Sequence, residues 1–113
     1  MSLDIHFELD KCQTCGRSDQ GPSLNITHNL GKMAVEAGVY SKVWRPDECG
    51  ITKASQMIAP LQTAIATMKA DPLRFEQYNA ENGWGTYKDF VLLLERYLEM
   101  CKLYPTATIS VSR

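Results

Sequence analysis

Hydrophobic and polar residues alternate at both ends of the chain, and this alternation constrains the fold more than any other feature of the sequence. The apolar members of the two segments are Leu3, Ile5, Phe7 and Leu9, then Ala107, Ile109 and Val111. A period of two is typical of a β-strand with one face on a hydrophobic core. Two short strands are unstable alone, so we expect segments 3–9 and 107–111 to pair in a small sheet.

The middle of the chain carries apolar residues at helical spacing. The pattern predicts a short helix over residues 28–37 and a longer one over residues 51–68. Pro60 lies inside the longer stripe and removes one backbone donor, so we expect either one kinked helix or two helices there.

Capping residues mark two further helix starts. Asp71 precedes Pro72, whose ring already has a helical φ, and Thr86 is followed three residues later by Asp89. We expect a short helix after Asp71, capped by its carboxylate, and a long final helix that stops at Pro105.

Residues 10–24 collect glycine, serine, aspartate and proline and are predicted to form a turn and a loop. Together these features predict an α+β fold that is mainly helical, with a small antiparallel sheet formed by the N- and C-terminal strands. With 113 residues, the chain is expected to be a single globular domain over residues 1–113.

Charge and hydropathy limit the class of partner. Twelve basic and thirteen acidic side chains leave almost no net charge, so the chain lacks the general electrostatic attraction of proteins that coat nucleic acids or anionic membranes. We therefore expect neither a nucleic-acid nor a membrane partner. No export signal and no apolar stretch of roughly 20 residues is present, which predicts a cytoplasmic protein with reduced cysteines.

Cys12 and Cys15 form a CxxC turn, and His28 follows thirteen positions after the second cysteine. Thiolate and imidazole suit the tetrahedral coordination of Zn²⁺, so we predict a zinc site with Cys12, Cys15 and His28 as ligands. The pattern is half of a recognised one, because no second Cys or His pair follows at the usual spacing. The alternative is that both cysteines are ordinary turn residues.

A polar stretch at the start of the first predicted helix is a candidate ligand cradle. Unpaired backbone donors at a helix start favour anions and capping groups alike. The side chains predicted to contact a ligand there are Asn25, Thr27, His28 and Asn29. The alternative is that Thr27 caps the helix while the asparagines satisfy the loop backbone.

Two tryptophans lie in loops bounded by residues that fix the backbone. Rigid aromatic side chains in such loops anchor partners or stack on planar ligands. The ligand contacts predicted from these two regions are Trp44, Arg45, Trp84 and Tyr87. The alternative is that each tryptophan covers the hydrophobic core.

Four segments carry a resemblance to a known group of proteins: NITHNLGKMAVEAGVY, WRPDE, NGWGTYKDF and the closing ISVSR. In these segments the chain resembles a family of short, uncharacterised proteins of tailed bacteriophages and bacterial prophages. The resemblance implies a phage or prophage setting and a free-standing cytosolic domain. That family has no established activity, so the resemblance assigns no catalytic residue.

These features favour a binding protein over an enzyme. The first hypothesis is a non-catalytic module in which the polar stretch and the two tryptophans recognise a small anionic ligand or a host protein. The second is a small metal-dependent enzyme in which His28 and a metal on Cys12 and Cys15 activate water. A third hypothesis gives the metal a purely structural role in tying residues 10–24 to the domain.

Overall fold

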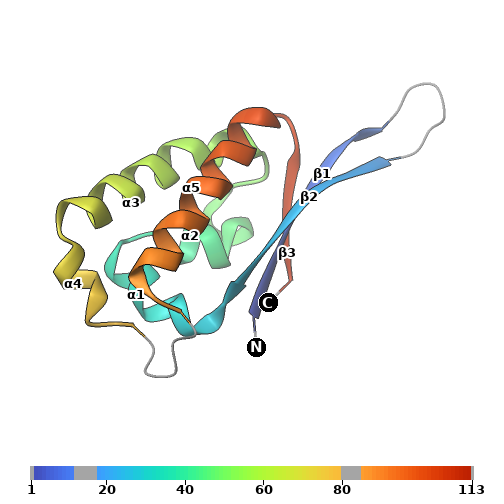
Figure 1. Cartoon of the computed structure of the whole chain (residues 1–113). Coiled ribbons are helices and arrows are strands. Elements are labelled where there is room, and N and C mark those ends of the chain that lie inside the picture. The colour runs from blue at the N-terminus through green and yellow to red at the C-terminus, as the bar shows by residue number, and fades with distance from the viewer. Residues whose placement is uncertain (1, 12–17, 80–84, 113) are drawn as a thin grey trace.

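The structure is a computed structural model, and it describes residues 2–11, 18–79 and 85–112 (Figure 1). The strands are β1 (Ser2–Lys11), β2 (Ser18–Thr27) and β3 (Thr108–Ser112). The 3-10 helices are η1 (His28–Leu30), η2 (Pro46–Cys49) and η3 (Ala54–Met57). The α-helices are α1 (Gly31–Glu36), α2 (Tyr40–Trp44), α3 (Ile58–Ala70), α4 (Pro72–Glu76) and α5 (Tyr87–Leu103). The predicted α+β class is confirmed.

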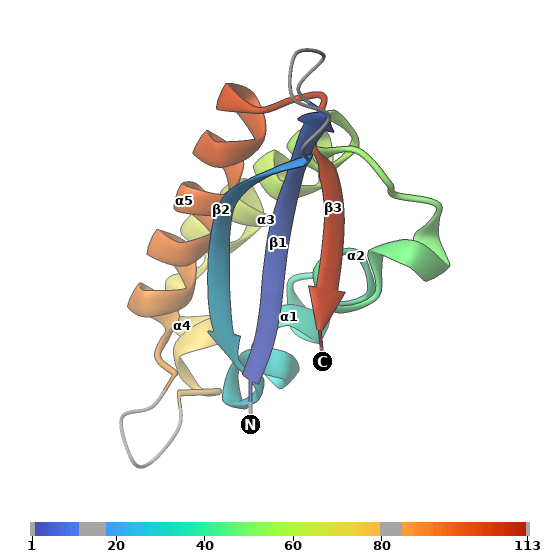
Figure 2. The same ribbon diagram turned by 90° about the vertical axis from the view of Figure 1, so that its right-hand side faces the viewer.

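The three strands form one antiparallel sheet in the order β2-β1-β3. The two ends of the chain pair as the alternation predicts, with Ile5 opposite Val111 and Phe7 opposite Ile109. The helices lie behind one face of this sheet, and the other face is open in Figure 2. Alternation arises because only the face toward the helices has to be apolar.

β2 is a strand that the sequence patterns do not predict. The expectation of a loop over residues 10–24 is wrong for residues 10–11, which end β1, and for residues 18–24, while residues 12–17 lie outside the described residues. Leu24 and Ile26 on this strand are buried against the core. Pro22 is tolerated because β2 is an edge strand and because its pairing with β1 contains register shifts. Turn-forming residues therefore hid a strand that tertiary pairing stabilises.

The first two predicted helices each divide into a 3-10 turn and an α-helix. The segment predicted over 28–37 forms η1 followed by α1. The segment predicted over 51–68 is helical only from Ala54, and the prediction is wrong for residues 51–53, where Lys53 pairs with Thr108. The helix starts as η3 and continues as α3, so the change of helix type falls before Ile58 and not at Pro60. Pro60 lies in the first turn of α3, where a backbone N–H has no helical acceptor to lose.

α4 and α5 begin where the capping patterns place them. Pro72 is the first residue of α4, although the Asp71 side chain makes no capping hydrogen bond, so that part of the prediction is wrong. Thr86 Oγ1 accepts a hydrogen bond from the Asp89 N–H (3.2 Å) at the start of α5. α5 ends at the second residue before Pro105, which agrees with the predicted stop.

One hydrophobic cluster lies between the sheet and the helices. Its five largest fully buried side chains are Trp44, Tyr97, Phe7, Phe75 and Phe90. Phe7 on β1 meets Tyr97 on α5 edge to face, with ring centroids 5.8 Å apart. These two rings tie the central strand to the longest helix.

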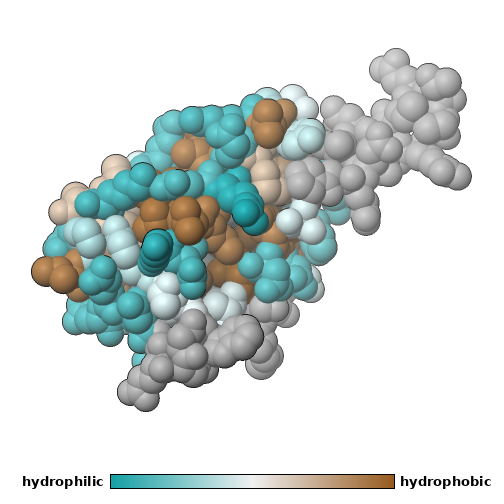
Figure 3. All heavy atoms as spheres, in the orientation of Figure 1, coloured by the Kyte–Doolittle hydropathy of each residue, from teal (hydrophilic) through white to brown (hydrophobic). Residues whose placement is uncertain are grey.

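The helical side of the molecule is largely hydrophilic, with some apolar side chains gathered near the middle of the view in Figure 3. The exposed large apolar side chains are Val35, Leu73, Leu92, Leu103 and Tyr104. They are spread over several helices, as is usual for a protein surface. Among the described residues, no helix is long and apolar enough to cross a bilayer.

Candidate functional site

His28 and Trp44 form the central pair of the candidate site. The indole N–H of Trp44 donates a hydrogen bond to Nδ1 of His28 across 3.0 Å, and the two ring centroids lie 6.4 Å apart. Trp44 is 1% exposed, whereas His28 is half-buried. Thr27 is the last residue of β2 and the N-cap of η1, so His28 lies at the margin of the core. Trp44, the last residue of α2, meets it there.

The Trp44 hydrogen bond fixes the position of the proton on the His28 ring. An indole N–H can only donate, so Nδ1 must present its lone pair and a neutral imidazole carries its proton on Nε2. Within the described part of the chain, the one buried polar side-chain atom without a partner is the hydroxyl of Tyr97. Nε2 of His28 has no hydrogen-bond partner among the same described residues, and the side chain is only half-buried. The neutral ring therefore keeps an N–H donor on Nε2 that these residues do not use.

Tyr40 fixes the indole from its other side. Tyr40 and Trp44 are one helical turn apart on α2, and their rings stack with centroids 5.1 Å apart and an interplanar angle of 17°. Trp44 is the last residue of α2, so its predicted place in a loop is wrong. It lies in the core, as the alternative interpretation expects. Its influence on a ligand runs through the orientation of His28, because its own ring is covered.

Arg45 follows Trp44 and is exposed. Its Nη1 lies 2.9 Å from Oε2 of Glu48. The hydrogen bond that Arg45 donates to Glu48, and then the charge of that carboxylate, raise the pKa of the Arg45 guanidinium, and Tyr40 adds to the same effect. Such an exposed ion pair adds little to folding stability, but it holds a permanent positive charge beside α2.

The polar stretch before α1 divides between two roles. Thr27 Oγ1 accepts a hydrogen bond from the Asn29 N–H (3.3 Å) and caps η1, as the capping alternative expects. Asn25 Nδ2 donates to Oδ1 of Asp4 on the neighbouring strand across 2.6 Å. The structure therefore brings Thr27 and Asn29 together at the helix start, while Asn25 belongs to the sheet.

The second tryptophan loop reaches the same helix start through Gly85. A Cβ built on Gly85 would lie 3.2 Å from Cδ2 of Leu30 and 3.3 Å from Cβ of Asn29. The φ of Gly85 is +114°, a conformation that favours glycine. Gly85 thus packs on the polar stretch at the start of η1. Trp84 lies outside the described residues.

Tyr87 contacts helices α3 and α4. Its hydroxyl donates to the carbonyl oxygen of Met68 across 3.0 Å, and its ring stacks on Phe75 with centroids 6.4 Å apart. Its backbone N–H donates to Oδ1 of Asn79 (2.7 Å). These contacts give the half-buried Tyr87 side chain a packing role between helices.

Two of the three predicted zinc ligands, Cys12 and Cys15, lie outside the described residues, so the zinc site stays a prediction. Among residues 2–11, 18–79 and 85–112, no group of three or more His, Cys, Asp or Glu side chains is arranged to hold a metal. The other two cysteines are free thiols, Cys49 exposed and Cys101 buried.

Tyr40 is the member of the site that the sequence reasoning missed. Its only signal is the spacing of four residues from Trp44, which places two aromatic rings on one side of a helix. The sequence offered no signal for the Trp44 to His28 hydrogen bond, because sixteen positions separate the two residues.

No protein-family model, curated protein or solved structure matches the chain. The resemblance to phage proteins therefore stays a prediction from the sequence. The function has to follow from the geometry around His28.

Proposed function

We propose that this protein is a small binding protein without a reaction of its own, and that it recognises a carboxylate or phosphate group through the Nε2–H of His28. The anionic group belongs to a small ligand or to a partner protein. The observation that carries the proposal is the 3.0 Å hydrogen bond from Trp44 to Nδ1, since it commits the other ring nitrogen of the half-buried His28 to donation.

Rigidity supports recognition at this position. The acceptor nitrogen is held by a buried indole, and that indole is stacked on Tyr40. A donor whose direction is fixed in advance loses less conformational entropy when a ligand binds. Hydrogen bonds to ionised acceptors are about twice as strong as neutral ones, so an anionic oxygen is the favoured partner.

The same hydrogen bond weighs against the metal-dependent enzyme. A neutral histidine binds a metal, or takes up a proton from water, through a nitrogen lone pair. In His28 the Nδ1 lone pair already accepts the Trp44 N–H, and Nε2 carries the proton. Ligation of zinc with Cys12 and Cys15 would require this buried hydrogen bond to break.

The setting of the protein is part of the proposal. The resemblance of the NITHN, WRPDE and NGWG segments supports a phage or prophage origin, with action in the cytoplasm of the host cell. A host protein that carries an exposed carboxylate or phosphate would then be a natural partner. Because the positive and negative charges of the chain are balanced, recognition of a single carboxylate or phosphate group is favoured over general attraction to a polyanion.

NMR titration of the intact protein tests the proposal. Acetate and inorganic phosphate are added separately, and the imidazole nitrogen and proton resonances of both histidines are followed. We expect the Nε2–H resonance of His28 to shift with saturation, while His6, on the open face of the sheet, does not.

Two matched variants identify the donor. His28→Asn keeps an acceptor for the Trp44 indole and removes the outward donor, so it should fold and lose the saturable response. His6→Asn should keep the saturable response to the anions. An unchanged His28 resonance with both anions, or an equal response in His28→Asn, would contradict the proposal.

A further inference from the structure

The two edges of the sheet differ in how they are closed. β2 forms one edge and carries Pro22 and an irregular register, features that block pairing with another strand. β3 forms the other edge and has neither feature in its five residues. The edge of β3 therefore determines whether the sheet can grow.

The chain itself occupies the first half of the β3 edge. The Ile109 N–H donates to the Thr52 carbonyl (2.8 Å), and the Ala54 N–H donates to the Ala107 carbonyl (2.9 Å). These bonds form an antiparallel bridge between Lys53 and Thr108. Residues 52–54 thus act as a fragment of a fourth strand.

The pairing with β3 does not extend to residues before Thr52, because the chain turns away from β3 at Gly50. Gly50 has φ +74° at the end of η2, and the Ile51 N–H donates back to the Pro46 carbonyl (2.9 Å). The chain therefore passes through η2 and leaves the position opposite the second half of β3 without a strand.

Backbone N–H and C=O groups of β3 point into the position opposite its second half. In an antiparallel strand, alternate residues direct both N–H and C=O to the same side. Because Ile109 points away from β1, Val111 does so as well. No backbone hydrogen bond from the described residues reaches Val111 on that side.

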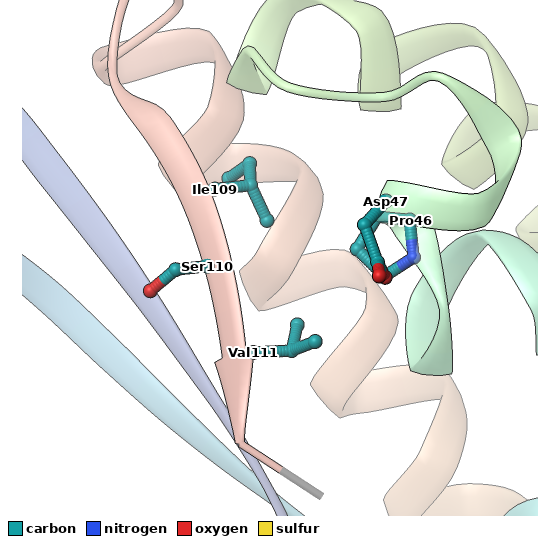
Figure 4. A pocket seen from close by; sticks show the side chains of 5 residues that line it. All are labelled: Pro46, Asp47, Ile109, Ser110 and Val111. Carbon is teal, nitrogen blue, oxygen red and sulfur yellow. The ribbon is translucent and has the colours of Figure 1, made fainter.

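A hollow lies beside these groups. It has a volume of about 270 Å³ and is lined by Pro46, Asp47, Ile109, Ser110 and Val111. In Figure 4 the side chains of Ile109 and Val111 point from β3 toward η2, whereas Ser110 points the other way. The inward side chain of a strand added next to β3 would enter this hollow.

We propose that the open half of the β3 edge binds an extended peptide segment of a partner protein, which pairs with Val111 and places an apolar side chain in the hollow between β3 and η2. The added segment continues the line of the isolated bridge between Lys53 and Thr108, and main-chain pairing at a sheet edge is an established mode of peptide recognition. This proposal goes beyond the His28 site and does not depend on it.

A peptide fits this edge better than a second copy of the chain. The open stretch begins after the bonded Ile109 N–H and ends at Ser112, about three residues or roughly 10 Å of strand. A stable dimer buries about 1,200–2,000 Å² in total, with some 20–30 residues on each side.

The test uses the full chain and the synthetic peptide acetyl-Lys-Thr-Val-Thr-Val-Lys-amide, followed by amide NMR. In the free protein we expect fast exchange of the Val111 amide proton and slow exchange of the Ser110 amide proton, which points toward β1. Saturable binding should shift the amide resonances of residues 109–112. A peptide of the same sequence with N-methylated interior residues should not bind.

Val111→Pro removes the outward N–H without removing a bond to β1, as proline at a sheet edge allows. It should weaken peptide binding by at least about fivefold, the loss of one net hydrogen bond. Val111→Thr keeps the N–H and should bind more tightly than Val111→Pro, and His28→Asn leaves this edge intact, so it should bind the peptide as the parent does.

Four results would overturn the proposal. They are an absence of shifts at residues 109–112, equal binding of the N-methylated peptide, equal binding by a folded Val111→Pro variant, and a Val111 amide that is already protected by self-association of the free chain. Failure of His28 to bind anions would leave the peptide result unaffected, so the two proposals fail separately.

Discussion

The indole N–H of Trp44 donates to Nδ1 of His28 across 3.0 Å and so sets the tautomer of the one histidine that stands at the margin of the core. A buried aromatic residue thereby controls the chemistry of a surface atom. The pair also fixes η1 to α2, so its loss should be measurable in folding stability as well as in binding.

Replacement of His28 by leucine should leave the buried Trp44 N–H without an acceptor and lower the free energy of unfolding by about 1–3 kcal/mol. His28→Asn retains an acceptor oxygen near the position of Nδ1 and should lose less. Urea unfolding followed by circular dichroism gives both values. Equal stability of the two variants would show that the hydrogen bond contributes nothing.

Tyr97 has a buried hydroxyl without a hydrogen-bond partner among the described residues. Tyr97→Phe removes this polar atom and keeps the edge-to-face contact with Phe7, so we expect unchanged stability or a gain of up to about 1 kcal/mol. Tyr97→Ala should cost about 3–5 kcal/mol, because the ring itself is lost. A clear loss in the phenylalanine variant, measured by thermal unfolding, would point to a partner for the hydroxyl.

Stability should fall at alkaline pH because of two buried acids on α5. Burial raises the pKa of the Cys101 thiol from 9.0 to about 12. Burial, and then the neighbouring Cys101, also raises the pKa of Tyr97 above its ordinary value of 10.0. The native state keeps protons that the unfolded chain releases, so this stability is complete below pH 9 and declines as the pH rises toward 12.

Urea unfolding between about pH 8 and pH 11 measures this decline. The double variant Tyr97→Phe and Cys101→Ala removes both groups and should flatten the dependence on pH, whatever its absolute stability. An equally steep decline in the double variant would assign the effect to other residues.

Gly85 and Gly31 should respond to alanine in opposite directions. At Gly85, with φ +114° and contacts to Asn29 and Leu30, the added Cβ should cost about 1–3 kcal/mol. Gly31 is the first residue of α1 and has a helical φ of −57°. Among the described residues its Cβ would meet Tyr40 alone, at 3.7 Å, so helix propensity should give a gain of about 0.5–1 kcal/mol. Thermal unfolding of both variants checks the pair, and loss at both positions would contradict it.

Much of the fold could be predicted from local pattern. The pairing of the chain ends follows from the alternation of Ile5 and Phe7 with polar residues, and the start of α5 follows from Thr86. β2 escaped prediction because Pro22 and its neighbours resemble a loop, and a strand with such residues forms only where β1 supplies a partner.

The candidate site was predictable in part. His28 and the capping role of Thr27 follow from a polar helix start, and Gly85 does pack on Asn29. Tyr40 and the open edge at Val111 could not be foreseen, because one depends on the packing of α2 and the other on the path of η2.

Periodicity and capping are properties of neighbouring residues, so the sequence alone established an α+β protein whose two ends form strands around a set of helices. Other features depend on long-range packing. Trp44 is a core residue and its N–H donates to His28, while the Tyr97 hydroxyl is buried. Half of the β3 edge has no neighbouring strand. Each of these depends on which atoms meet across the core, and hydrogen bonds of that kind are set by three-dimensional contact and not by residue order.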